Sequence, residues 1–360
     1  MKPYKIIISG GGTGGHLYPA LAIADEFQSR YNTAEILFVG AMGRIEMDKV
    51  PKSGYRIIGL WIDGIQRSLS IRNLMFPVKL VLSFLKSISI LLKFKPDVVI
   101  GTGGFASGPL LFIAGVLNIP TLIQEQNSYP GITNKLLSKT VKTIAVAHEG
   151  LERFFPKEKL NLTGNPIRKS ITDSKLSPNK AKAFFKQIPG IPTLVVLGGS
   201  LGAKRINQLI ATHLDTFEKQ GLQLIWQCGS LYYEQYKKHQ SERVKIMSFV
   251  AEIDKLYAAA DMVISRSGAA TLSELCFTAR PVLLVPSPNV AENHQYHNAM
   301  ALADKGAALV IAEKDLDLNF PNCFKLLLDH KKRNEMSKNL KALAQPDATA
   351  KIVDLIEALL

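Results

Sequence analysis

The stretch that decides the fold is Tyr4–Arg30, which reads YKIIISGGGTGGHLYPALAIADEFQSR. Its first part, Tyr4–Ser9, is a short apolar run rich in isoleucine, which is typical of a buried β-strand. The second part, from about Pro19 to Arg30, has the spacing of a helix, and a glycine-rich turn joins the two. A strand, a glycine turn and a helix in this order predict a doubly wound α/β domain with a parallel sheet.

The same pattern recurs in two blocks along the chain. Expected strands lie at Ile36–Val39, Asp97–Gly101, Thr121–Gln124, Thr193–Leu197, Leu222–Gln227, Val244–Met247, Met262–Ser265 and Val282–Val285. A polar stretch near Asn165–Asn179 separates the blocks, so we place the break between two domains near Gly164–Asn165. Ligands of such sheets bind at the carboxyl ends of the strands, which predicts a site in a cleft that the two domains face.

Composition narrows the class of protein. The chain has 360 residues, 47% hydrophobic and 21% charged, which excludes a disordered or low-complexity protein and suits two domains. Its three cysteines, Cys228, Cys276 and Cys323, are widely spaced and fit a reducing compartment. The N-terminus shows no export signal, so we expect a cytoplasmic protein.

The net charge of +14 favours an anionic partner: nucleic acid, a phosphorylated metabolite or an acidic membrane. Nucleic acid is the less favoured partner, because the sequence lacks the interleaved aromatic and basic residues that are typical of RNA-binding segments. Residues 64–96 instead combine six basic residues and no acid with many apolar residues. Lys79, Lys86 and Lys93 recur every seven residues, with Ser83 and Ser87 between them, so we expect one basic face on an otherwise apolar helix. Pro77 and the lysines exclude a membrane-spanning helix. Two interpretations stay open, a helix buried against a sheet and an interfacial membrane patch.

The first glycine turn admits more than one interpretation. Gly10, Gly12 and Gly15 match G-x-G-x-x-G, but a dinucleotide site also needs an acid closing the second strand, where Gly40 and Ala41 stand. A turn without side chains brings backbone amides close to a sugar or phosphate, or it serves packing alone.

Further glycine turns follow other strands. One is Gly101–Pro109 in the first domain, and another is Gly198–Ala203 in the second, where amides and the Ser200 hydroxyl predict an anion nest for a diphosphate. In Ser265–Glu274, the carboxylate of Glu274 falls on the second turn of a helix, where it could accept both hydroxyls of a ribose. A helix-dipole or salt-bridge role for Glu274 is the alternative.

Seven motifs in order along the chain resemble the MurG family of peptidoglycan glycosyltransferases, which add N-acetylglucosamine (GlcNAc) to lipid I. They are GGTGGHLYPALAIA (Gly11–Ala24), GTGGFASGP (Gly101–Pro109), QEQNSYPGITNK (Gln124–Lys135), GNPIR (Gly164–Arg168), LGGSLGAKRIN (Leu197–Asn207), SRSGAATLSE (Ser265–Glu274) and the region from Pro286 to His294-Gln295. Two departures are Phe105, where the family usually has tyrosine, and Leu201, where it usually has glutamine.

The resemblance implies a GT-B fold of glycosyltransferase family 28, with two Rossmann-like domains. The acceptor domain is expected at residues 1–164 together with a last helix at about 342–360, and the UDP-GlcNAc domain at 165–341. The residues it assigns to UDP-GlcNAc are Thr13, Gly14, Gly15, Asn127, Arg168, Ser200, Val250, Ala269, Ala270, Thr271, Leu272, Ser273, Glu274 and Gln295. The acceptor loop would comprise Gly103, Gly104, Phe105 and Ser107.

The implied reaction is an inverting displacement at GlcNAc by the C4 hydroxyl of the lipid I sugar, giving lipid II. It needs a base, for which His16 is the first candidate and Glu125 the second, although His16 could equally be a structural cap or a sugar-binding residue. Positive helix ends and Arg168 could meet the charge of the departing UDP, so no cofactor is required, although a divalent cation could stimulate the reaction. We expect no metal site, because the pair His294 and His297 lacks companion metal ligands.

Other functions remain as alternatives. The nearest are other nucleotide-sugar enzymes on this fold, of the lipid A disaccharide synthase or UDP-GlcNAc 2-epimerase type, followed by an NAD-dependent dehydrogenase and a non-catalytic membrane scaffold. For the favoured function, the partners are UDP-GlcNAc, lipid I and an anionic membrane surface. The expected location is peripheral, on the cytoplasmic face of the inner membrane.

Overall fold

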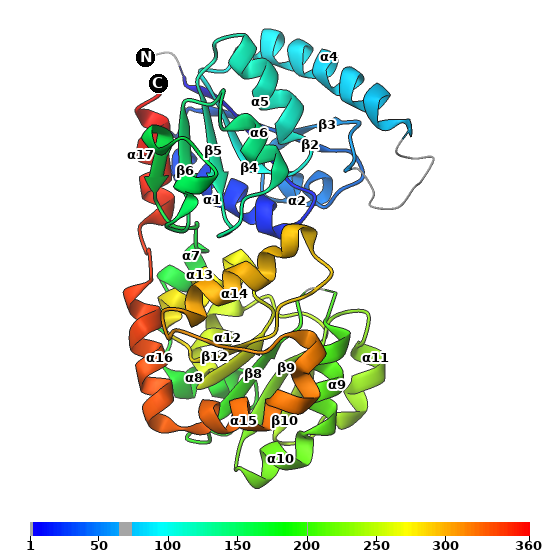
Figure 1. Ribbon diagram of the computed structural model, residues 1–360, viewed down its shortest axis with the longest axis vertical. Coiled ribbons are helices and arrows are strands. Elements are labelled where there is room, and N and C mark those ends of the chain that lie inside the picture. Colours follow the sequence, from blue (N-terminus) through cyan, green and yellow to red (C-terminus); the bar gives the residue numbers. More distant parts are fainter. Residues whose placement is uncertain (1–2, 65–73, 200) are drawn as a thin grey trace. The chain divides into compact units, whose positions relative to one another are not determined.

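The computed structural model describes residues 3–64, 74–199 and 201–360 (Figure 1). The chain divides into two compact units. The first comprises Met1–Arg168 with Gln345–Leu360, and the second comprises Lys169–Ala344. Arg67, Arg72 and Ser200 fall outside the described residues.

The first unit contains a parallel sheet of seven strands in the order β3-β2-β1-β4-β5-β6-β7. The strands are β1 (Lys5–Gly10), β2 (Glu35–Ala41), β3 (Arg56–Leu60), β4 (Val98–Gly103), β5 (Thr121–Glu125), β6 (Thr143–Val146) and β7 (Leu160–Leu162). The helices are α1 (Gly14–Arg30), α2 (Glu46–Lys52), α4 (Phe76–Phe94), α5 (Ser107–Val116), α6 (Ile132–Leu137) and α17 (Ala348–Glu357). Because β1 lies beside both β2 and β4, the chain reverses direction across the sheet at β1, which is the arrangement of a doubly wound fold.

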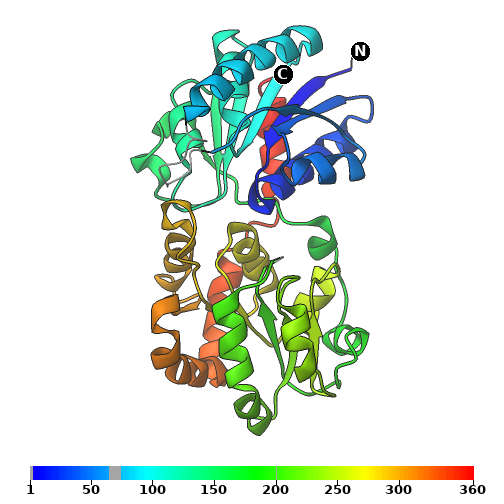
Figure 2. The ribbon, with the colours of Figure 1, turned by 90° about the vertical axis from the view of Figure 1, so that its right-hand side faces the viewer.

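Side chains of β1 alternate between two cores, one on each face of this sheet. Ile6 and Ile8 pack with α1 and with Ile352, Val353 and Ile356 of α17, all of them fully buried. Ile7 packs on the opposite face among residues of α4 and α5. The C-terminal helix α17 is therefore part of the core of the first unit, where it lies beside α1 (Figure 2).

The second unit contains a parallel sheet of six strands in the order β10-β9-β8-β11-β12-β13. The strands are β8 (Thr193–Leu197), β9 (Gln223–Gln227), β10 (Val244–Met247), β11 (Met262–Ser265), β12 (Val282–Leu284) and β13 (Leu309–Val310). The helices are α7 (Lys169–Thr172), α8 (Pro178–Phe184), α9 (Lys204–Thr212), α10 (Leu214–Lys219), α11 (Tyr233–Tyr236), α12 (Ile253–Ala259), α13 (Ala269–Thr278), α14 (His294–Ala303), α15 (Leu316–Leu328) and α16 (His330–Ala342). One of its cores surrounds Trp226 of β9, whose side chain is fully buried.

The expected fold class is confirmed, and the central strands lie within one or two residues of their predicted ends. The strands that the pattern missed are β3, β6, β7 and β13. Three of these, β3, β7 and β13, are edge strands, and most of their residues are only partly buried or exposed. Helix α1 begins at Gly14 rather than near Pro19, because the glycine turn itself forms the first helical turn and Thr13 occupies its N-cap position.

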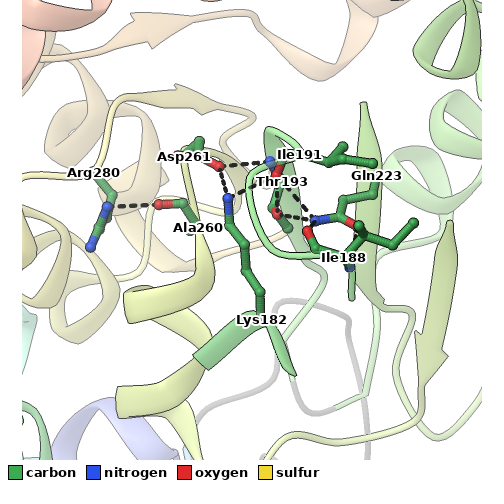
Figure 3. A network of polar contacts seen from close by, with 8 residues as sticks. All are labelled: Lys182, Ile188, Ile191, Thr193, Gln223, Ala260, Asp261 and Arg280. Carbon is green, nitrogen blue, oxygen red and sulfur yellow. Dashed lines mark hydrogen bonds and ion pairs between the residues drawn. The ribbon is translucent and has the colours of Figure 1, made fainter. Parts of the chain in front are cut away.

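A polar network closes the amino-terminal end of the second sheet (Figure 3). Lys182 of α8 is nearly buried and donates to the Asp261 carboxylate at 2.7 Å and to the Ile191 carbonyl at 2.8 Å. The Gln223 amide donates to the Ile188 carbonyl and to the Thr193 hydroxyl, both at 2.9 Å. These bonds tie the segment before β8 to the starts of β9 and β11. They lie at the amino-terminal ends of the strands, and the glycine turn lies at the carboxyl ends.

Helix α4 departs from the predicted arrangement. Ser83 and Ser87 are buried, and the Ser87 hydroxyl donates to the Ser83 carbonyl at 2.7 Å, so the serine face is turned into the protein. The exposed face carries the large apolar side chains of Val78, Val81, Leu82, Leu85 and Leu92. The exposed lysines Lys86 and Lys93 lie among them. Of the expected basic face, Lys86 and Lys93 are exposed, whereas Ser83 and Ser87, which were expected between the lysines on that face, are buried. Within the described residues, no helix is sufficiently long and apolar to cross a membrane.

Candidate functional site

Three loops meet at the carboxyl ends of β1, β4 and β5, because these strands are neighbours in the first sheet. The glycine turns after β1 and β4 touch directly, with the Gly11 amide donating to the Gly103 carbonyl at 3.3 Å. Gly103 and Gly104 have φ of +100° and +97°, which disfavours other residues there. A Cβ on Gly104 would lie 2.5 Å from the Gly11 carbonyl oxygen, so only glycine allows this approach.

His16 lies on the first turn of α1 and faces the turn after β4. Its Nδ1 atom is 3.1 Å from Oε1 of Gln126, the residue that follows β5. A Cβ on Gly103 would lie 2.7 Å from Nδ1, so the missing side chain of Gly103 makes room for the imidazole. Thr102 donates its hydroxyl to the His16 carbonyl at 2.7 Å, which joins this turn of α1 to β4. The side chain of His16 remains partly exposed.

Glu125, the other candidate base, is almost completely buried at the end of β5. One carboxylate oxygen accepts from the amide and the side chain of Asn127, both at 3.0 Å. The other oxygen accepts from the Asn134 side chain at 2.9 Å and from the Gly131 amide at 3.1 Å. Four donors around one carboxylate hold the loop that carries Gln126 and Asn127. They suit a structural anchor better than a group that exchanges protons with substrate.

The remaining candidates of the first unit lie around the same edge. Thr13 is exposed and occupies the N-cap position of α1 without a side-chain capping bond, and Gly14 and Gly15 form the first helical positions. The Arg168 guanidinium lies 5.7 Å from the centre of the Tyr18 ring of α1. In the expected acceptor loop, Phe105 is 45% exposed, whereas Ser107 is buried and donates to the Gly104 carbonyl at 2.8 Å.

Glu46 is a buried acid that sequence reasoning missed. It begins α2, is fully buried, and accepts from the Gly12 amide at 2.8 Å and from the Ala41 amide at 2.9 Å. Its carboxylate therefore occupies the Gly12 amide of the first glycine turn, a donor that a pyrophosphate would otherwise use. A dinucleotide site needs an acid at the end of the second strand to bind the ribose. The acid near that position, Glu46, instead binds the glycine turn. No motif marks this role, because it depends on a short helix folding back over the turn.

In the second unit, the glycine turn after β8 is held by its neighbour β9. Gly199 and Gly202 have φ of +82° and +91°, and the Gly202 amide donates to the Gly199 carbonyl at 2.9 Å. The Gln227 side chain also donates to the Gly199 carbonyl, at 2.7 Å. Ser200, to which the diphosphate was assigned, belongs to the undescribed residues, and α9 starts just beyond the turn with Ala203 as its N-cap.

The expected ribose acid lies on α13, whose N-terminus carries the other assigned residues: Ala269, Ala270, Thr271, Leu272 and Ser273. Glu274 is buried, and its carboxylate accepts from the Tyr257 hydroxyl at 3.0 Å. Tyr257, on α12, is fully buried and was not singled out from the sequence. The bond holds the carboxylate in one direction.

Two assigned residues lie in other loops of this unit. Gln295, at the start of α14, accepts from the Ser287 amide at 2.9 Å through its side chain. Its carbonyl accepts from the Ser267 hydroxyl at 2.7 Å, which ties α14 to the turn after β11. Val250 is buried in the loop after β10. Among the residues described, no cluster of three or more His, Cys, Asp or Glu side chains could hold a metal ion.

Two parallel doubly wound sheets, with glycine turns at their carboxyl ends, form the GT-B architecture of glycosyltransferases. Residues 6–146 match the glycosyltransferase family 28 N-terminal domain, and residues 193–352 match the glycosyltransferase family 28 C-terminal domain. Within that class, the chain belongs to the family of UDP-N-acetylglucosamine–N-acetylmuramyl-(pentapeptide) pyrophosphoryl-undecaprenol N-acetylglucosamine transferases, the MurG family.

The relatives match over their whole length. A member of this family from Flavobacterium psychrophilum is 55% identical over 99% of this chain and 98% of its own. A member from Christiangramia forsetii is 53% identical over 99% of this chain and 98% of its own length. Among solved structures, MurG from Acinetobacter baumannii has a TM-score of 0.80 at 27% identity, covering 99% of this chain and 100% of that protein. A UDP-N-acetylglucosamine 2-epimerase, with a TM-score of 0.66 at 12% identity, shares the fold.

Proposed function

We propose that this protein transfers GlcNAc from UDP-GlcNAc to the C4 hydroxyl of the N-acetylmuramyl sugar of lipid I, producing lipid II for peptidoglycan. The observation that carries the proposal is the full-length identity of 55% to a relative that bears the name of this activity. The epimerase alternative rests on a shared fold alone. The dehydrogenase alternative is not favoured, since Glu46 binds the first glycine turn itself.

The second unit would bind the donor. The backbone of the turn after β8 and the N-terminus of α13 offer amide donors to the diphosphate. Glu274, held by Tyr257, would accept the ribose hydroxyls, and the backbone of Val250 would meet the uracil. Gln295, at the start of α14, would bind the GlcNAc hydroxyls.

The first unit would supply the chemistry. The acceptor C4 oxygen attacks the anomeric carbon of GlcNAc as the bond from that carbon to the UDP phosphate breaks, so the configuration inverts. The acceptor proton passes to His16, and the negative charge leaves with UDP, where Arg168 and helix N-termini would stabilise it. Glu125 would position Asn127 and the loop after β5 rather than take the proton, because four donors already surround it.

Helix α4 would hold the first unit against the membrane that carries the acceptor. Its exposed apolar face would enter the boundary between headgroups and acyl chains, and Lys86 and Lys93 would meet anionic headgroups. Lys79 is less available, since it is paired with Asp63 and its ammonium holds the pKa of that carboxyl below its usual range. This arrangement predicts a peripheral protein on the cytoplasmic face of the inner membrane.

The decisive assay is transfer of radiolabelled GlcNAc from UDP-GlcNAc to a short-chain lipid I analogue, first in EDTA and then with magnesium. Product under both conditions supports the transferase and a displacement without metal. Product only with magnesium keeps the transferase and assigns part of the leaving-group stabilisation to the ion. No product, with UDP still bound tightly, would overturn the acceptor assignment.

A further inference from the structure

Behind His16 lies a chain of side-chain amides that the reaction proposed above does not use. Gln126 lies against Nδ1 of His16, Gln124 donates to Asn165 at 2.9 Å, and Asn165 donates to the Gln126 carbonyl at 3.1 Å. Gln126 in turn donates to Oε1 of Gln124 and, at 2.7 Å, to the carbonyl of Thr102. Gln124, Gln126 and Asn165 are each at most 3% exposed.

Two backbone carbonyls fix which way these amides point. A carbonyl oxygen can only accept, so the amide atom of Gln126 beside Thr102 must be its NH₂ group. The atom of Gln126 that faces His16 must then be the oxygen. At the other end, the Gln126 carbonyl requires the NH₂ group of Asn165, which leaves the Asn165 oxygen to accept from Gln124. The oxygen of Gln124 then faces the NH₂ group of Gln126, so the two ends assign the same orientation.

The orientation decides where the imidazole carries its proton. An amide oxygen cannot donate, so Nδ1 must hold the hydrogen that lies between His16 and Gln126. In the neutral ring, Nε2 then carries the lone pair. Among the described residues, Nε2 has no hydrogen-bond partner, and the side chain is partly exposed. The nitrogen able to take a proton is therefore the one turned away from the buried amides.

We propose that Gln126, held by Gln124 and Asn165, is a positioning residue that locks His16 in the Nδ1-protonated form and so makes Nε2 the base. The inference rests on the proposed role of His16. A neutral amide differs from a carboxylate in this position, because it orients the ring without adding a charge that would favour the imidazolium before the reaction. After proton transfer, the same oxygen still accepts from Nδ1.

The direct test is the ring ¹⁵N spectrum of the full chain labelled with [¹⁵N]histidine, with His16 assigned by its absence in H16Q. At a pH where His16 is neutral, Nδ1 is expected to resonate as a protonated nitrogen and Nε2 as an unprotonated one. Free histidine prefers the opposite form, so Q126M, which keeps the length of the side chain, is expected to shift His16 toward the Nε2-protonated form. Protonation on Nε2 in the unsubstituted protein, or an unchanged spectrum in Q126M, would overturn the proposal.

Kinetics supply a second readout. Q126M is expected to lower kcat about 10- to 100-fold, the range seen when a histidine that binds a metal loses the partner that orients it, with the KM for UDP-GlcNAc nearly unchanged. Q124M should have a smaller effect, because Thr102 still holds Gln126. The matched control is Q187M, at a buried glutamine of the second unit, which should leave kcat and the His16 spectrum unchanged. A fall in kcat equal to that of Q126M in the control would reduce Gln126 to a structural role.

The two readouts separate this inference from the proposed function. If the unsubstituted protein transfers no GlcNAc to lipid I but shows the expected spectrum that Q126M changes, the acceptor assignment fails and the tautomer assignment stands. If transfer proceeds while His16 carries its proton on Nε2, the present inference fails alone.

Discussion

His16 combines the two properties that a base needs, a partly exposed ring and a fixed orientation, whereas Glu125 is buried under four donors. We therefore expect H16A to lower kcat by about 10²–10⁴-fold, the usual contribution of a positioned base, with little change in the KM for UDP-GlcNAc. Steady-state transfer to a lipid I analogue measures both constants. Turnover near that of the unsubstituted protein would move the role to Glu125.

Glu274 is expected to act on the donor alone. A hydrogen bond to a charged group contributes about 1.5–3 kcal/mol, so E274A should raise the dissociation constant for UDP-GlcNAc by roughly 10- to 100-fold. The KM for the acceptor should change much less. Y257F, which removes the hydroxyl that donates to the carboxylate, should cause a smaller rise. Unchanged donor affinity in E274A, measured by calorimetry against the exposed control E234A, would contradict the assignment.

Glu46 is expected to matter for stability as well as for the shape of the first glycine turn. Removing it leaves the Gly12 and Ala41 amides without their acceptor, and each buried donor left unpaired costs about 1–3 kcal/mol. Urea unfolding of E46A should show this loss. D48A, an exposed acid on the same helix, should stay within about 0.5 kcal/mol of the unsubstituted protein. Equal stability of E46A and D48A would show that water replaces the carboxylate.

At the scale of elements, α4 shows how far a periodic pattern can be trusted. The seven-residue spacing of its lysines indicated a helix, and the helix is present. The spacing could not predict which face packs against the sheet, because apolar residues lie on both the buried and the exposed faces of the helix. Burial of Ser83 and Ser87 places Val81, Leu82 and Leu85 outside, an arrangement that costs free energy in water unless something apolar covers the face.

Binding of α4 to a membrane can be tested by flotation with liposomes. Each lysine near an anionic surface contributes about 1 kcal/mol, so K86Q/K93Q should lower partitioning onto anionic vesicles by roughly 30-fold. L82S/L85S should lower it on anionic and neutral vesicles alike, since those residues bury apolar area. K331Q/K338Q, on α16 of the second unit, is the matched control. Equal, salt-insensitive recovery of the unsubstituted protein on both kinds of vesicle would exclude the electrostatic part.

At the scale of the whole molecule, the first unit depends on the C-terminal helix, far away along the chain. Ile352 of α17 is fully buried against the core of the first unit, so I352A should cost about 2–5 kcal/mol there. The chain has two tryptophans, Trp61 in the first unit and Trp226 in the second, which can report on each unit separately. In the W226F background, I352A should lower the urea midpoint that is reported by Trp61 fluorescence. In the W61F background, I352A should leave the midpoint reported by Trp226 unchanged.

The control for this experiment is K351A, an exposed neighbour on α17, which should leave both transitions in place. An equal shift of both transitions in I352A would show that the two units unfold as one cooperative body.

The sequence by itself determined the fold class, the central strands and the position of the glycine turns. These follow from local patterns, since a buried parallel strand is a continuous apolar run and a tight turn at its end needs glycine. It did not determine β3, β6, β7 and β13, of which β3, β7 and β13 are edge strands with a neighbour on one side only.

Only the tertiary structure decided which polar groups meet. Glu46 lies 34 residues from Gly12, Gln126 lies 110 residues from His16, and Tyr257 lies 17 residues from Glu274. No local pattern encodes such a pair, because the order of strands in the sheet brings the partners together. The sequence therefore identified His16 and Glu274 as candidates by their place after glycine turns, while the groups that orient them became visible in the folded chain.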